Sequence, residues 1–239
     1  MDRVVRVAIV EDHPVVIEGV TSWLNAYPQR RIEVTQVVPD IGTLQPLTRL
    51  QADVVILDLE LGGRMIMDEI SGLAAGGQRI VVFSAHGDPR IIDAVIDAGA
   101  CAFVAKDEGR DHLFDAVLAV ADDRPYVTRS QAKAILADRR PGRPALSGKE
   151  HEALLLWFQG MSKASVARRM SISENTVRQY IDRARIKYAA AGRPAPTKDA
   201  LLARAIEDGI IQPAEVALYT SYASGYASGQ MPPSAPKGT

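Results

Sequence analysis

The first 121 residues alternate short apolar runs with longer segments that carry apolar residues at helical spacing. Val54-Val55-Ile56-Leu57 is apolar at every position, so both faces of that strand must be buried. Strands that alternate with helices in this way predict a doubly wound, five-stranded parallel sheet covered by helices on both faces. The predicted strands are Val4–Val10, Ile32–Val38, Val54–Asp58, Ile80–Ser84 and Cys101–Ala105, and the predicted helices are Val15–Ala26, Gly42–Leu50, Ile66–Ala75, Pro89–Ala98 and Asp111–Ala121.

The alternation of strand and helix patterns ends after residue 121. Prolines, a glycine and arginines near its end predict an exposed linker over 122–146, which contains a short helix at Ser130–Ala137. Residues 147–211 are helical throughout, and two of their helices are joined by a turn short enough for a helix-turn-helix. The residues from 212 to 239 are predicted to be a disordered tail. The four helices of the second domain are predicted at Gly148–Phe158, Ser162–Met170, Ser173–Ala189 and Thr197–Asp208.

Composition narrows the class of protein. The chain has 239 residues, of which 47% are hydrophobic and 24% charged, as expected for a soluble protein of two small domains. No apolar run approaches the ~18–20 residues of a membrane span, and no secretory cleavage motif follows the N-terminus. Cys101 is the single cysteine, which excludes an internal disulfide and a thiolate metal cage. We therefore expect a cytoplasmic protein without a membrane partner.

Charge is distributed unevenly along the chain. The net charge is −8 over residues 1–121, +3 over 122–146 and +4 over 147–211, although the whole chain carries only −1. The acidic part is suited to cations or basic surfaces, and the basic part is suited to a phosphate backbone.

Polar side chains of matching chemistry stand at the ends of four predicted strands. Glu11 and Asp12 follow the first strand and Asp58 ends the third, so the three carboxylates meet if these strands are neighbours. Such a cluster needs a hard cation, and carboxylate oxygens suit Mg²⁺. Ser84 and Lys106 add the hydroxyl and the ammonium that could bind a phosphoryl group transferred to Asp58. Any one of these residues alone would be assigned to a solvated loop, and their combination favours a site.

Residues 4–121 resemble the receiver domain of two-component response regulators. The resemblance implies that Asp58 is the phosphoacceptor and that a sensor histidine kinase is the donor. Glu11, Asp12, Asp58 and the backbone carbonyl of Glu60 would then hold Mg²⁺. Lys106 would contact the phosphoryl group, and Ser84 with Phe103 would form a hydroxyl–aromatic switch. The matching motifs are Val10-Glu11-Asp12-His13-Pro14, Val55-Ile56-Leu57-Asp58-Leu59, Phe83-Ser84-Ala85 and Phe103-Val104-Ala105-Lys106-Asp107.

The loop after Asp58 departs from the family pattern. It lacks the usual proline and contains Gly62-Gly63-Arg64, which predicts a mobile loop with Arg64 near the pocket. Arg64 would stabilise a phosphoryl group or neutralise an empty pocket, with a solvated arginine as the alternative. The departure keeps a rival hypothesis open, in which a degenerate receiver serves only as a dimerisation, ligand or partner module. An enzyme of the haloacid-dehalogenase type is disfavoured, because Glu60 stands where that class needs a second aspartate.

The second helix of the predicted helix-turn-helix has a core stripe and a polar face. Its apolar residues recur at Val177, Ile181, Ala184 and Tyr188. The polar face contains arginine and glutamine, which can pair bidentately with guanine and adenine edges in the major groove. Charge alone fits a solvated basic helix equally well.

Residues 147–211 resemble the output domain of LuxR/NarL-type regulators, and the chain is expected to be a transcription factor rather than an enzyme. The resemblance implies that double-stranded DNA is bound, that a homodimer forms on activation, and that RNA polymerase is a further candidate partner. Arg178, Gln179 and Asp182 occupy base-facing positions, and Arg183 belongs to the same surface. Residues in backbone-contact positions are Lys163, Asn175, Thr176 and Lys187. The motifs are Leu146-Ser147-Gly148-Lys149-Glu150, Gln159-Gly160-Met161-Ser162-Lys163, Ile172-Ser173-Glu174-Asn175-Thr176-Val177-Arg178 and Ile186-Lys187-Tyr188.

Overall fold

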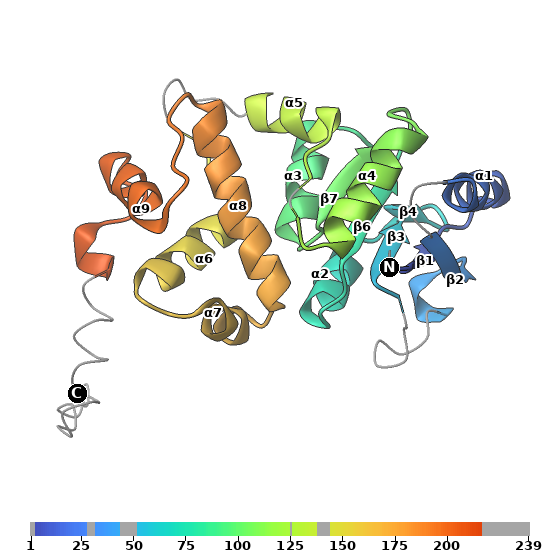
Figure 1. Cartoon of the computed structure of the whole chain (residues 1–239), viewed down its shortest axis with the longest axis horizontal. Helices are drawn as coiled ribbons and strands as arrows, with labels where there is room; N and C mark the ends of the chain where they lie inside the picture. Colours follow the sequence, from blue (N-terminus) through green and yellow to red (C-terminus); the bar gives the residue numbers. More distant parts are fainter. Residues whose placement is uncertain (1–2, 28–31, 44–51, 125, 138–143, 217–239) are drawn as a thin grey trace.

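A five-stranded parallel sheet forms the centre of the N-terminal domain (Figure 1). The structure is a computed structural model that describes residues 3–27, 32–43, 52–124, 126–137 and 144–216. The strand order β2-β1-β3-β6-β7 makes the first and third strands neighbours and confirms the predicted doubly wound sheet. The strands are β1 (Val5–Val10), β2 (Ile32–Val38), β3 (Val54–Leu57), β6 (Ile80–Ser84) and β7 (Ala102–Ala105).

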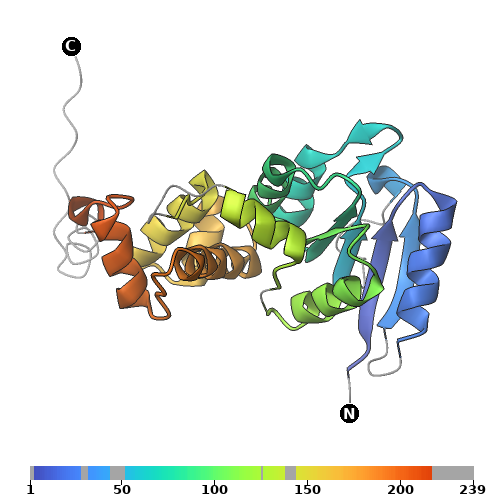
Figure 2. The same ribbon diagram turned by 90° about the horizontal axis from the view of Figure 1, so that it is seen from above.

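Helices cover both faces of this sheet, as Figure 2 shows from above. One apolar cluster joins the sheet to α1 and α4, and a second joins its other face to α2 and α3. The fully apolar β3 is buried on both sides, which explains why its sequence does not alternate. Of the helix predicted at 42–50, a 3-10 turn at Ile41–Thr43 is described, and residues 44–51 lie outside the described part of the chain. The helices are α1 (Pro14–Asn25), α2 (Met67–Ala75), α3 (Pro89–Asp97) and α4 (Arg110–Ala121).

The segment after Asp58 is a β-hairpin, where we predicted an irregular loop. β4 (Glu60–Leu61) and β5 (Arg64–Met65) pair antiparallel around Gly62 and Gly63. Both glycines have left-handed backbone angles, with φ of 58° and 73°, as a tight two-residue hairpin turn requires. The paired glycines therefore fix the direction of the turn.

The linker contains helix α5 (Arg129–Ala137), close to the predicted position. Thr128 and Gln131 form a reciprocal cap at its first turn, and Ala134 is buried in the cluster that contains α3 and Phe103. Helix α5 is thus packed on the receiver. Residues 138–143 of the linker lie outside the described residues.

The C-terminal domain has the four predicted helices. Ser147, Ser162, Ser173 and Thr197 cap them, and Ser147 with Glu150 forms the predicted capping box. Residues 212–216 belong to the predicted tail, yet Val216 packs against the domain core; residues 217–239 lie outside the described part. No helix of the described residues is long and apolar enough to cross a membrane. The helices are α6 (Gly148–Phe158), α7 (Lys163–Met170), α8 (Glu174–Ala190) and α9 (Lys198–Glu207).

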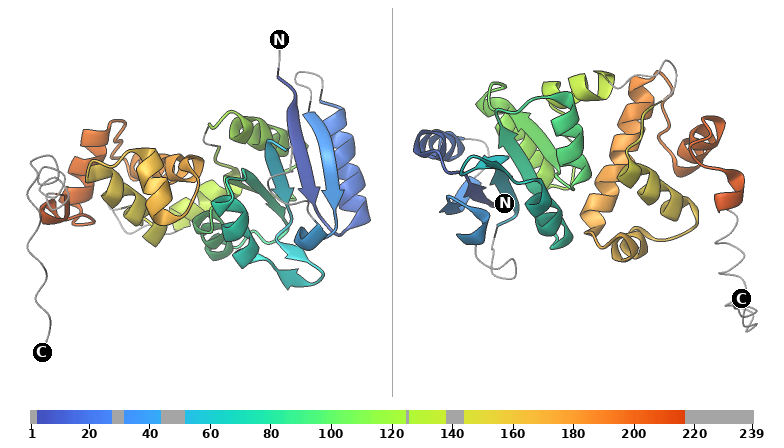
Figure 3. Two further views of the ribbon diagram at one scale, coloured as in Figure 1. Left: turned by 90° about the horizontal axis from the view of Figure 1, so that it is seen from below. Right: turned by 180° about the vertical axis from the view of Figure 1, so that it is seen from behind.

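Helix α8, the second helix of the helix-turn-helix, lies between its own domain and the receiver (Figures 1 and 3). Its apolar stripe packs into the C-terminal domain. Another face reaches the end of α3 and the loop before β7, at the opposite end of the sheet strands from the Asp58 side chain.

Candidate functional site

The carboxyl ends of the strands bring together three of the predicted site residues. The Lys106 ammonium donates hydrogen bonds to Asp58 Oδ2 at 2.8 Å and to Glu11 Oε2 at 2.9 Å. Glu11 and Asp58 are 3% and 4% exposed, so the two carboxylates share one cation in a pocket that is almost closed to water. Burial alone would lower the pKa of Lys106, but the bonds to Asp58 and Glu11 outweigh it and leave that pKa above its usual value. Lys106 therefore stays charged.

Asp12 is held beside this pair by the hairpin. The Gly62 amide donates to Asp12 Oδ2 at 2.8 Å and lowers the pKa of that carboxyl. Asp12 Oδ1 is buried and has no hydrogen-bond partner among the described residues, although His13 Nδ1 lies 3.0 Å away. The Gly62 turn thus fixes the position of the Asp12 carboxylate and favours its ionised form.

The donor atoms fit a hard cation. One ligand atom from each of Glu11, Asp12, His13 and Asp58 lies within 4.8 Å of the others. Three of the four are carboxylates, the donors that Mg²⁺ prefers. His13 donates to Glu11 at 2.8 Å, and this bond raises the pKa of its imidazole. The Nδ1 atom is engaged by Glu11, so the carboxylates are the fitting ligands.

The predicted switch residues lie on the two strands beside this pocket. Ser84 is fully buried and Phe103 is fully buried. The Lys106 amide donates to the Ser84 carbonyl at 2.9 Å, which ties the ends of β6 and β7 together. Sequence reasoning missed His86, whose imidazole lies 2.6 Å from Glu60 Oε2 and whose amide donates to Ser84 Oγ at 3.4 Å.

Arg64 lies outside the pocket. Its guanidinium bonds Glu69 at 2.7 Å, and its side chain is 74% exposed. Of the two readings of Arg64, the structure supports the solvated arginine.

Helix α8 divides the predicted DNA-binding residues into two groups. Thr176, Gln179 and Arg183 are buried, and Lys187 is 12% exposed. The other predicted residues are more accessible: Arg178 is exposed, and Lys163, Asn175 and Asp182 are partly exposed. Asp182 bonds Arg185 at 2.8 Å and Arg178 bonds Glu174 at 2.9 Å, so these two side chains are paired within their own helix.

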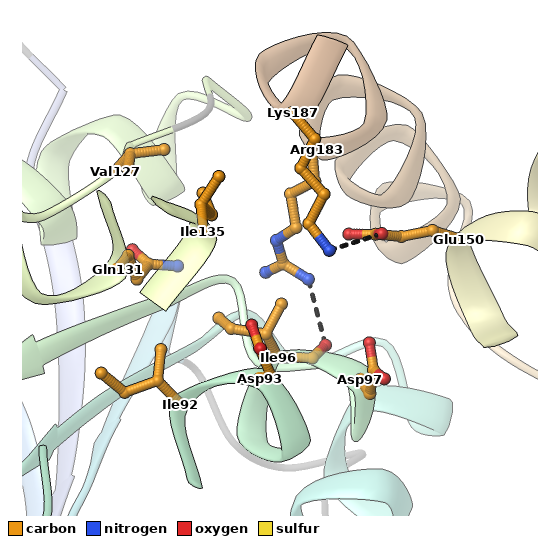
Figure 4. Close-up of a pocket in the computed structure, with 10 residues that line it drawn as sticks. All are labelled: Ile92, Asp93, Ile96, Asp97, Val127, Gln131, Ile135, Glu150, Arg183 and Lys187. Atoms are coloured by element: carbon orange, nitrogen blue, oxygen red, sulfur yellow. Dashed lines mark hydrogen bonds and ion pairs between the residues drawn. The ribbon is translucent and has the colours of Figure 1, made fainter. Parts of the chain in front are cut away.

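The buried group is covered by the receiver. Arg183 donates to the Ile96 carbonyl oxygen at 3.0 Å (Figure 4). It also donates to the carbonyl oxygens of Cys101 at 3.4 Å and of Ala100. These carbonyls lie at the C-terminal end of α3 and just beyond it, where the helix dipole favours a cation. Burial lowers the pKa of Arg183, but a guanidinium remains charged, so the carbonyls must satisfy it.

Two further contacts surround Arg183. The Tyr180 hydroxyl donates to the Asp97 carbonyl at 2.9 Å, and burial raises the pKa of Tyr180 to about 12. Lys187 bonds the buried Glu150 at 2.9 Å. Burial also raises the pKa of the Asp97 carboxyl, which faces Glu150 and the two cations Arg183 and Lys187.

Sequence reasoning missed Tyr180, Asp97 and Glu150 as interdomain residues. The one available signal was Tyr180, a large aromatic beside the core stripe.

Comparisons with known proteins give a family match for each of the two domains. Residues 7–118 match the response regulator receiver domain, and residues 144–195 match the luxR family of bacterial regulatory proteins. A probable transcriptional regulatory protein NarL of Mycobacterium tuberculosis is 28% identical over 85% of this chain and 96% of its own length. The nitrate/nitrite response regulator protein NarP of Escherichia coli is 28% identical over 80% of this chain and 92% of its own. A crystal structure of a LuxR-family two-component response regulator from Aurantimonas is 26% identical and has a TM-score of 0.52. That comparison covers 57% of this chain and 99% of the other. The luxR family model and the two curated relatives describe regulatory proteins rather than enzymes.

Proposed function

Since this chain belongs to the two-component response regulators of the LuxR/NarL type and is a DNA-binding transcriptional regulator, we propose that phosphorylation of Asp58 switches its DNA binding on. The observation that supports the proposal is that α8, the predicted DNA-binding helix, is also the helix that contacts the receiver. Arg183, Gln179 and Thr176 belong to its predicted DNA-binding surface and are buried. The described state therefore keeps these three residues of the surface away from a duplex.

The pocket supplies the groups for phosphoryl transfer. An oxygen of Asp58 attacks the phosphorus of a phosphohistidine in a sensor kinase; the new P–O bond forms as the P–N bond breaks, and the histidine nitrogen leaves. Glu11, Asp12, Asp58 and the Glu60 carbonyl would hold Mg²⁺, which neutralises charge on the phosphoryl oxygens. Lys106 leaves its present carboxylate partners and bonds the phosphoryl group, and the Ser84 hydroxyl turns toward it. Phe103 then repacks toward the space that Ser84 vacates.

The free output domain would bind DNA as a dimer. One recognition helix buries little surface, so two linked copies on adjacent half-sites gain affinity through effective concentration. A regulator of chromosomal DNA acts in the cytoplasm, where we place this chain.

The rival is a regulator that ignores phosphorylation, and one experiment separates the two. A duplex is enriched from a randomised pool with the chain treated with acetyl phosphate and Mg²⁺. Its affinity and the oligomeric state are then measured for wild type and Asp58→Asn, with and without the donor, at fixed salt. We expect tighter binding and dimerisation with the donor in wild type only. Equal binding by both proteins under both conditions would establish the rival. Failure to enrich any duplex would contradict the assignment of the DNA-binding surface.

A further inference from the structure

The first turn of α5 is attached to the edge of the receiver sheet. β7 is the last strand in the order β2-β1-β3-β6-β7, so its outer backbone groups have no strand partner among the described residues. The Thr128 hydroxyl donates to the Phe103 carbonyl at 2.8 Å. Glu108 accepts from the Ala105 amide at 2.9 Å with one carboxylate oxygen and from the Ser130 amide at 2.8 Å with the other. Two side chains thus bind α5 to the main chain of β7.

This attachment involves the strand that carries the switch. Phe103 and Lys106 are both within or next to β7, and the backbone bond from Lys106 to Ser84 links that strand to β6. Thr128 is 1% exposed, so its bond to the Phe103 carbonyl is shielded from water. A change in the position of Phe103 or Lys106 therefore acts directly on Thr128 and Glu108.

The segment that includes α5 also borders the output domain. Val127, Gln131 and Ile135 line a pocket that Arg183 and Lys187 of α8 also line (Figure 4). Ala134, one helical turn after Gln131, is buried in the same apolar cluster as Phe103. A helix of nine residues has little stability of its own, so its position is set by these contacts. Helix α5 consequently touches both the switch strand and the contact that covers α8.

We propose that α5 couples the phosphorylation pocket to the interdomain contact, and that Thr128 and Glu108 are the positioning residues for this coupling. The inference rests on the proposed function. Repacking of Phe103 and withdrawal of Lys106 shift the β7 backbone, Thr128 and Glu108 carry the shift to α5, and the wall that receives Arg183 and Lys187 changes shape. The competing route runs through α3 alone, since α3 also contacts Arg183.

The test measures coupling, which is the ratio of duplex affinities with and without beryllium trifluoride and Mg²⁺. Thr128→Val removes the hydroxyl and keeps the shape, and Glu108→Gln removes one of two acceptor oxygens. Thr128→Ser keeps the hydroxyl and is the rescue variant. Lys133→Ala, at an exposed position of α5, is the matched control. Phosphoryl uptake from acetyl phosphate is followed by phosphate-affinity electrophoresis, and folding by thermal melting.

We expect Thr128→Val and Glu108→Gln to take up phosphoryl as wild type does. Their ratio of duplex affinities should be at least threefold smaller than the wild-type ratio. Thr128→Ser and Lys133→Ala should keep the ratio. A wild-type ratio in folded Thr128→Val and in Glu108→Gln would overturn the inference and assign the coupling to α3. If Thr128→Val alone melts early, Glu108→Gln decides. A wild-type protein whose affinity does not respond to beryllium trifluoride would instead contradict the proposed function, which keeps the two failures distinct.

Discussion

Removing one hydroxyl from the interdomain contact should partly activate the unphosphorylated chain. Tyr180→Phe deletes the 2.9 Å bond to the Asp97 carbonyl and leaves the ring in place. The ring is 1% exposed and packs in the output-domain core, so the helix-turn-helix should stay folded. A neutral hydrogen bond contributes about 0.5–1.5 kcal/mol net, because water replaces it in the open state. The equilibrium constant for separating α8 from the receiver should therefore rise about two- to twelvefold.

Duplex affinity reports this change directly. While the open state is minor, the apparent affinity is proportional to the open fraction, so it rises by the same factor. With beryllium trifluoride and Mg²⁺, wild type and Tyr180→Phe should bind equally, since both are then open. Tyr188→Phe is the matched control, because Tyr188 is buried in the output-domain core on the same helix. An unchanged affinity of unphosphorylated Tyr180→Phe, or an equal rise in Tyr188→Phe, would refute the argument that this contact blocks DNA binding.

Three further predictions concern other parts of the molecule. Cys101 is the single cysteine and is buried beside α8, which raises its pKa; its reaction with a thiol reagent should accelerate when the phosphoryl donor is added, and an unchanged rate would show that the contact stays closed. Burial raises the pKa of Asp97, so closure favours its neutral form. Closure should therefore strengthen as pH falls through that raised pKa and weaken above it, and Asp97→Asn should flatten the pH dependence of duplex binding relative to wild type. Gly63→Val places a β-branched residue at φ 73° and should cost about 1–2 kcal/mol in thermal unfolding. It should also weaken Mg²⁺ binding measured by calorimetry, whereas Gly63→Asn should be tolerated; equal Mg²⁺ affinity in both variants would separate the hairpin from the metal pocket.

The sheet and its acidic pocket could be predicted because both follow from local sequence. β3 is an uninterrupted apolar run, and Asp58 stands directly at its end. Once β1 was expected beside β3, the meeting of Glu11 and Asp58 followed from parallel-strand geometry. The hairpin was missed because paired glycines were taken to signal flexibility. Gly62 and Gly63 have the left-handed angles of a two-residue turn, which is the more specific meaning of such a pair.

The contact between the receiver and α8 could not be predicted in the same way. Arg183 is held by carbonyl oxygens of Ile96, Ala100 and Cys101, and a backbone acceptor has no residue type that marks it in a sequence. Arg183 and Lys187 were predicted to belong to the DNA-binding surface. The sequence does not reveal that the receiver occupies this surface, because a guanidinium that suits a phosphate also suits the carbonyl end of a helix.

In the proposed function, this shared chemistry makes the receiver and DNA direct competitors for the same atoms. Arg183 cannot bond α3 and a duplex at once, so whatever strengthens closure weakens DNA binding by the same free energy. Moving such an equilibrium from about 1% to 99% open takes roughly 5.5 kcal/mol. The Tyr180 bond and the Arg183 bonds to carbonyls, at about 0.5–3 kcal/mol each, can together supply a difference of that size. In the proposed function, a phosphoryl group at Asp58 needs only to distort the α3–α5 wall enough to lose these few bonds, without unfolding either domain. The contact over α8 is therefore large enough to repress and small enough to be released.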